Sequence, residues 1–105
     1  MLSNNYNLYE QIISVLKTIY DPELYINIYE LGLIYDIKLN NNNNVIITMT
    51  LTSPNCPIAD KFLTDIKNKI NNINDINNVK INLIFEPQWN KDMMSEEAKL
   101  ELGFL

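Results

Sequence analysis

The chain has 105 residues, 47% of them hydrophobic, so it can bury one modest core, and we expect a single domain over residues 1–105. Its formal net charge of −5 disfavours nucleic acid and anionic membranes as principal partners, because both are negatively charged. The absence of histidine excludes Ser-His-Asp triads, Cys-His dyads and histidine metal ligands.

The chain also contains only one cysteine, which cannot form an intramolecular disulfide. This is typical of a protein from a reducing compartment. No stretch resembles a signal peptide, and no apolar run approaches the roughly 20 residues that a membrane helix needs. We therefore expect a cytoplasmic protein that does not bind membranes.

The first predicted element is a one-sided helix. Its apolar residues recur at helical spacing, and polar residues lie between them. We expect this helix to stop at Asp21-Pro22, because a residue before proline is disfavoured in the helical region. The apolar positions are Leu8, Ile12, Val15, Leu16 and Ile19.

Two strands and a hairpin are predicted next. Residues alternate between apolar and polar types over 33–39 and again from Val45 to Thr52, which predicts strands. The asparagine run Asn40–Asn44 between them is typical of a hairpin loop, since asparagine tolerates positive φ. Gly32 precedes the first strand and predicts a turn or a close backbone approach there.

The second strand leads directly into the stretch that contains the single cysteine, Met49 to Asp60. Pro54 and Pro57 interrupt any ladder, and Pro57 suits the first position of a helix. Cys56 then lies at or beside the helix N-cap, where the helix dipole favours a thiolate. The sequence therefore predicts either a reactive or metal-seeking thiol at Cys56, or a small residue that only caps the helix. Asp60 in the first turn limits how far the thiol pKa can fall.

The rest of the chain predicts a helix, a strand and a short helix. The helix from Cys56 has an apolar side, and alternation over 79–86 predicts a third strand that Pro87 stops. Ser95 is expected to cap a short helix over 96–102, with Gly103 as its C-cap. We therefore predict an α+β two-layer sandwich with a small three-stranded sheet, two main helices on one face and a short C-terminal helix. The apolar side of the second main helix comprises Phe62, Leu63, Ile66, Ile70 and Ile73.

Four motifs in the same order resemble the metal–sulfur cluster biosynthesis family, which includes SufT and the PaaD-like proteins. The resemblance spans nearly the whole chain. The sequence departs from the family pattern at Asn55, where a small residue is expected, and at Tyr29, where an acid is common. The motifs are Asp21-Pro22-Glu23, the segment from Ile28 to Tyr35, the segment from Met49 to Pro57, and Trp89 together with Met94 to Lys99.

The resemblance implies an accessory role in the maturation of iron–sulfur proteins, as a transient cluster carrier or as an adaptor between a carrier and its client apo-proteins. It places the functional thiol on Cys56 and acidic companions on Asp21 and Glu23. It implies no enzymatic activity and no firmly bound cofactor. The implied partners are iron–sulfur assembly proteins, carrier proteins and client apo-proteins.

The chemistry of clusters limits how Cys56 could bind one. An iron–sulfur cluster usually takes four thiolate ligands, and one chain supplies one. Cys56 could therefore ligate a cluster only if the site is shared, across a homodimer or with a partner protein. A transient cluster is expected at most.

Two alternative functions from other classes remain at this stage. The chain could be a small thiol-dependent enzyme with Cys56 as its nucleophile, although it lacks histidine and a resolving cysteine. It could also be a purely structural interaction module, with Trp89, Met93 and Met94 as an apolar contact surface. For these three residues, packing of the tail over the core is the simpler interpretation.

Overall fold

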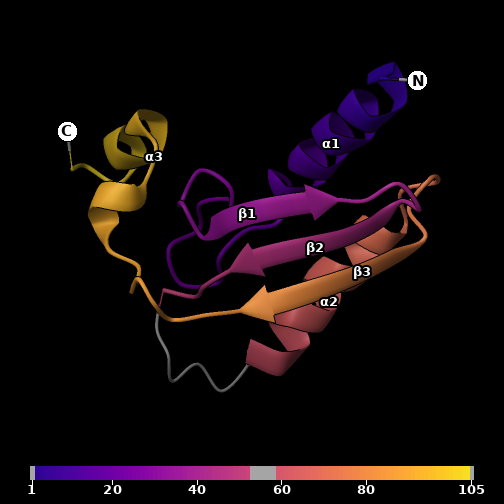
Figure 1. Cartoon of the computed structure of the whole chain (residues 1–105). Coiled ribbons are helices and arrows are strands. Elements are labelled where there is room, and N and C mark those ends of the chain that lie inside the picture. The colour runs from indigo at the N-terminus through magenta and orange to yellow at the C-terminus, as the bar shows by residue number, and fades with distance from the viewer. Residues whose placement is uncertain (1, 53–58, 105) are drawn as a thin grey trace.

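Residues 2–52 and 59–104 are described by a computed structural model of the chain (Figure 1). The predicted order of elements is confirmed, with one additional 3-10 helix before the last helix. The elements are α1 (Leu2–Leu16), β1 (Ile34–Leu39), β2 (Asn44–Met49), α2 (Ala59–Asn71), β3 (Asn78–Leu83), the 3-10 helix η1 (Lys91–Met93) and α3 (Glu96–Glu101).

The sheet has the strand order β1-β2-β3. The asparagine hairpin makes β1 and β2 antiparallel, and Asn43 takes the positive φ of 60° that the turn requires. The crossover through α2 makes β3 parallel to β2, with Ile47 beside Ile81. The register between β1 and β2 shifts at Tyr35, between the pairs Ile34/Met49 and Asp36/Thr48.

Both main helices pack on one face of this sheet, as predicted. The buried residues of α1, α2 and the inward-facing strand positions form one hydrophobic cluster, which also includes the loop before β1. Alternation along β2 produces this face, since every second residue from Val45 to Met49 is buried. The buried helix residues are Leu8, Ile12, Leu16, Ile66 and Ile70.

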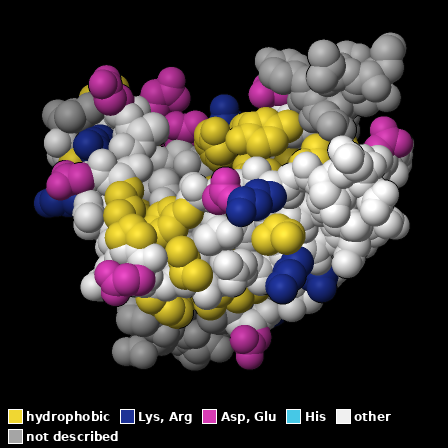
Figure 2. Space-filling view, viewed as in Figure 1, with side chains coloured by type: hydrophobic (Ala, Val, Ile, Leu, Met, Phe, Trp, Pro, Cys, Tyr) yellow, Lys and Arg dark blue, Asp and Glu magenta, His cyan; other side chains and the backbone are white. Residues whose placement is uncertain are grey.

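The opposite face of the sheet is exposed and polar. Figure 2 views the molecule from this side and shows lysine and acidic side chains with groups of hydrophobic side chains between them. Only Ile46 among the exposed large hydrophobic residues lies on these strands, and it is 40% exposed. The outward-facing positions of the strands are therefore mostly polar. The exposed charged residues of the strands are Asp36, Lys38 and Lys80.

The first helix ends earlier than predicted. It stops at Leu16 rather than at Asp21-Pro22, because the hydroxyl of Thr18 donates to the carbonyl of Val15 and closes the last turn. Ile19 is buried outside the helix, where its carbonyl accepts a hydrogen bond from Ile28 N at 2.8 Å. The chain thus leaves the helix to pair with the loop that precedes β1.

The strands are also shorter than the alternation predicts. β2 ends at Met49 rather than at Thr52, and β3 ends at Leu83 rather than at Glu86. Two backbone hydrogen bonds continue the pairing for one residue, from Thr50 N to Leu33 O and from Ile84 N to Met49 O. Beyond β2, Leu51 is still buried in the core, whereas Phe85 beyond β3 is 39% exposed.

The second main helix is described from Ala59 to Asn71, and its predicted start at Cys56 lies outside the described residues. Its apolar side is confirmed, with Ile66 and Ile70 buried and Phe62 and Leu63 half-buried against the cluster. None of the described helices combines the length and apolar character needed to cross a membrane.

The tail covers one end of the sheet (Figure 1). Ser95 caps α3 as predicted, and its Oγ accepts a hydrogen bond from Ala98 N at 3.1 Å. Met94 is buried, and Trp89 packs partly buried against the core. Trp89 Nε1 also donates to the carbonyl of Leu31 at 2.7 Å. The predicted packing of the tail is thus confirmed for Trp89 and Met94, whereas Met93 is half-buried and contacts the Tyr35 hydroxyl.

Candidate functional site

The Asp21 loop is a tight turn built around a buried carboxylate. Asp21 is 5% exposed, and its Oδ1 accepts hydrogen bonds from Glu23 N at 2.8 Å and Leu24 N at 2.9 Å. Pro22 lies between Asp21 and Glu23 and fixes the direction of the turn. A carboxylate that accepts two backbone N–H groups stabilises the loop itself. Asp21 therefore has a structural role, whatever else it does.

The loop is closed by its own backbone. Asp21 N donates to Ile26 O at 3.0 Å, and Tyr25 N donates back to Asp21 O at 3.0 Å. Tyr25 takes a positive φ of 60°, which is uncommon for a residue with a bulky side chain, and its side chain is 75% exposed. Glu23, the other predicted acidic companion, is exposed beside the turn. The two predicted acids thus lie in one loop but in different environments.

This loop lies beside the first turns of α2. A groove of about 290 Å³ separates the two elements and is lined by loop residues on one side and by helix residues on the other. α2 is described from Ala59, three positions after Cys56 in the sequence. The structure therefore places the Asp21 loop next to the helix that follows the cysteine. The lining residues are Tyr20, Pro22, Lys61, Phe62 and Asp65.

Cys56 and Asn55 lie outside the described residues. The geometry of the site is therefore described for the Asp21 loop and α2 alone. Over residues 2–52 and 59–104, no three acidic side chains are arranged to hold a metal ion. Any metal or cluster bound here would need donors beyond this part of the chain.

Tyr29, where the family resemblance leads one to expect an acid, is half-buried against the core. Lys17 Nζ lies 5.3 Å from the centre of its ring, and the same ammonium lies 3.8 Å from Glu30 Oε2. The tyrosine thus contributes packing and a cation–π contact at this position.

The segment between the Asp21 loop and β1 is attached to the tail. Gly32 has a φ of 82°, and a Cβ at this position would overlap the carbonyl of Met93. Ser95 N donates to Glu30 O at 2.8 Å on the same segment. The close backbone approach predicted at Gly32 is confirmed, and the partner is the tail.

Two hydroxyl side chains, half-buried Tyr35 and buried Thr50, lie at the same end of the sheet. Tyr35 donates to Pro87 O at 2.8 Å and also contacts Met93 Sδ. Burial raises the pKa of the Tyr35 hydroxyl above its ordinary value, and the nearby Thr50 hydroxyl opposes this shift. Thr50 is fully buried, and its Oγ1 makes no well-formed hydrogen bond to a described residue. We therefore regard the effect of Thr50 on Tyr35 as the weaker one.

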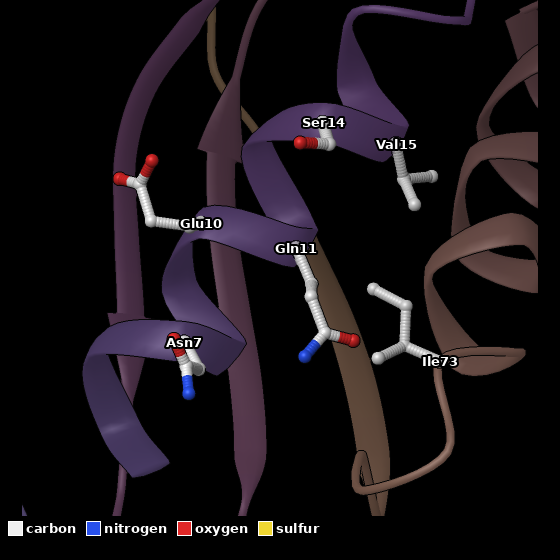
Figure 3. A pocket seen from close by; sticks show the side chains of 6 residues that line it. All are labelled: Asn7, Glu10, Gln11, Ser14, Val15 and Ile73. Atoms are coloured by element: carbon white, nitrogen blue, oxygen red, sulfur yellow. The ribbon is translucent and has the colours of Figure 1, made fainter. Parts of the chain in front are cut away.

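A different hollow of about 400 Å³ lies between α1 and the residues that follow α2 (Figure 3). Gln11 and Val15 extend from α1 toward Ile73, whereas Glu10 points away from it. The lining contains one carboxylate and none of the predicted site residues. It offers no convergent set of groups for catalysis or metal binding.

Sequence reasoning did not identify the groove residues that face the Asp21 loop. Tyr20 directly precedes Asp21, and Lys61 and Asp65 follow the cysteine on one helix, so their proximity in sequence to both motifs was the available signal. It also missed Tyr35 and Thr50, which alternation placed only as strand residues.

The arrangement defines a class of protein: a small α+β sandwich in which an acidic Asx-turn loop lies beside the helix that follows a strand–cysteine junction. Residues 9–83 match the family described as iron-sulfur cluster assembly protein. The chain therefore belongs to this family.

Individual relatives agree with this assignment. A protein of Porphyromonas gingivalis named Fe-S protein maturation auxiliary factor is 54% identical over 91% of each chain. The Staphylococcus aureus protein named Fe-S protein maturation auxiliary factor SufT is 39% identical over 79% of this chain and 94% of its own. A crystal structure of a domain of unknown function DUF59 from Bacillus anthracis superposes with a TM-score of 0.87 and 37% identity, covering 95% of each chain. The predicted resemblance to the SufT family is confirmed.

Proposed function

We propose that this protein is an accessory factor in the maturation of iron–sulfur proteins, as a transient cluster carrier or an adaptor between a carrier and client apo-proteins. The observation that carries the proposal is the 54% identity to a protein named Fe-S protein maturation auxiliary factor, over 91% of both chains. The absence of histidine in the sequence agrees with a role that needs no general base.

The chemistry of the chain is compatible with both of these roles, and it disfavours a third one, a protein that holds a cluster permanently. One thiolate per chain cannot fill the four positions of a cluster. The described acidic residues form no metal-binding group that could complete the shell. Cys56 would therefore act together with a second copy or with the thiolates of a partner protein, and no cofactor would be resident.

In this proposal the Asp21 loop provides a rigid surface beside α2. Its buried carboxylate holds the turn through two backbone N–H groups, which leaves exposed Glu23 and Tyr25 on a fixed scaffold. Such a loop could dock an assembly protein, a carrier or a client without changing shape. The proposed partners are these proteins of the cytoplasm, and the chain would catalyse no reaction of its own.

The decisive experiment replaces Cys56 by serine. We expect Cys56→Ser to abolish the activity of cluster-dependent client enzymes in a strain depleted of the protein, while the thermal unfolding midpoint stays unchanged. Asp75→Asn, an exposed position outside the Asp21 loop, serves as a control for a surface change. Full complementation by Cys56→Ser would refute the role of the thiol.

Anaerobic purification with iron and sulfide analysis then separates the two roles. A carrier would retain iron and sulfide that disappear in Cys56→Ser, whereas an adaptor would contain neither in both proteins. Turnover of a small thiol substrate without any cluster protein would contradict the proposal and support a thiol enzyme.

A further inference from the structure

The third strand forms an open edge of the sheet. β3 pairs with β2 on one side, and no other strand of the described residues pairs with it. Alternate N–H and C=O groups of an edge strand point away from its neighbour and are available to another chain. Figure 1 shows β3 at the margin of the sheet with α2 behind it.

A groove runs along this edge between β3 and α2. It has a volume of about 360 Å³, and half-buried Leu63 and Ile81 supply apolar surface from the helix and the strand. Thr64 and Asn78 contribute polar surface. A groove of this kind beside a free strand offers both main-chain hydrogen bonds and side-chain contacts.

The charges along the groove are all positive. Lys67 of α2 and Lys80 of β3 are the charged residues that line it, and both are exposed. This contrasts with the net charge of −5 for the chain and with the small hollow near α3, where Glu30, Glu97 and Glu101 are the charged lining residues. The β3 edge is therefore a locally cationic site on an acidic protein.

We propose that the edge of β3 binds an extended, acidic segment of a partner protein, which adds a fourth strand to the sheet. Side chains of an added strand would alternate between the face that carries Lys80 and the face that carries Leu63 and Lys67. The segment that fits has acidic residues at alternate positions, with apolar residues between them. This inference stands independently of the function proposed above.

A second copy of the chain is a poorer occupant. Two β3 edges related by a twofold axis would bring Lys67 and Lys80 of one copy toward the same lysines of the other. Like charges at short range oppose such pairing, and lysine on an edge strand commonly prevents it. The acidic segment must therefore come from a different protein.

The test uses the full-length protein and a phage-displayed library of random linear peptides. We expect selection to enrich peptides with alternating acidic and apolar residues. A synthetic peptide of the enriched sequence should shift the amide resonances of β3 and α2 in an NMR titration and leave β1 unchanged. N-methylation of alternate peptide residues should abolish binding, because it removes the main-chain donors.

The matched variants reverse charge inside and outside the groove. Lys67→Glu combined with Lys80→Glu should weaken binding of the synthetic peptide by about tenfold or more. The combination of Lys38→Glu and Lys69→Glu changes the net charge equally at exposed positions outside the groove lining, and should leave the affinity within about twofold. Thermal unfolding checks that all variants are folded.

Several outcomes would overturn the proposal. These are a selection without enrichment, enriched peptides without acidic residues, resonance shifts confined to other elements, and equal weakening by both double variants. Concentration-dependent self-association with shifts on β3 would assign the edge to a second copy instead.

Discussion

One end of the sheet is covered by the tail of the chain, whereas the edge formed by β3 is uncovered. At the end where β1 begins, the tail closes the structure through hydrogen bonds from Trp89 to Leu31, from Ser95 to Glu30 and from Tyr35 to Pro87. Along β3, no described strand or tail segment covers the edge, and lysines line it.

We expect these two regions to contribute differently, the covered end to the stability of the fold and the open edge to the binding of partners. The closed end, which includes Asp21 and Gly32, is held by hydrogen bonds and close backbone contacts between its own segments. Its residues hold the site in place, and changes there should alter the free energy of unfolding. The outward side chains of the open edge are exposed, so changes there should alter binding more than the free energy of unfolding.

The largest change in the free energy of unfolding is expected at Gly32, where the backbone of the closed end lies against that of the tail. Gly32→Ala should lower the free energy of unfolding by about 3 kcal/mol, because the new Cβ overlaps the Met93 carbonyl and alanine disfavours a φ of 82°. Urea unfolding measures it. Gly103→Ala is the matched control, since Gly103 has a φ of 83° with open space around it, and should cost only about 1 kcal/mol. Equal losses in the two variants would show that contact with the tail is unimportant.

The Asp21 loop should give the next largest effect and tests whether the closed end is only structural. Asp21→Ala leaves the N–H groups of Glu23 and Leu24 without their acceptor and should cost about 2 kcal/mol. Asp21→Asn keeps one oxygen acceptor and should cost less. Client maturation should follow stability across the two variants if the role is structural. Loss of maturation in a stable Asp21→Asn protein would instead show a direct role of the carboxylate charge.

The smallest effect is expected at Tyr35. Tyr35→Phe removes the hydrogen bond to Pro87 O and should cost about 0.5–1 kcal/mol at neutral pH.

The pH dependence provides a second readout at this residue. Because the pKa of Tyr35 is raised in the folded state, the native protein holds the proton more tightly than the unfolded chain. This contribution is complete below the ordinary pKa of 10.0 and is lost as pH rises through the raised value. Above about pH 10, the free energy of unfolding measured in urea should therefore fall more for the wild type than for Tyr35→Phe. Parallel pH profiles would contradict the assignment.

Much of the fold was predictable from local patterns. Alternation identified the three strands, helical spacing identified both main helices, and Ser95 marked the start of α3. The family also followed from short motifs in a fixed order. Element ends were less predictable, because Ile19 and Ile84 look like helix and strand residues in the sequence, although Ile19 packs in the core beyond α1 and Ile84 lies beyond β3.

The candidate site was predictable only in its parts. The sequence indicated the Asp21-Pro22-Glu23 motif and the cysteine that precedes α2, and these remain predictions for function. It could not show that the Asp21 carboxylate is buried and bonded to its own loop, nor that Tyr20 and Phe62 face one groove. The groove depends on contact between segments about 40 residues apart, which no local pattern encodes, whereas the hydrogen bonds of Asp21 reach only two and three residues along the chain.

The sequence by itself determined the class of fold, the family and the single thiol, since each follows from residue identity and spacing along the chain. Only the tertiary structure decided which end of the sheet is closed and which edge is open. The position of the tail at one end of the sheet produces that difference. This position depends on long-range contacts such as that between Gly32 and Met93, which form only when the whole chain has packed.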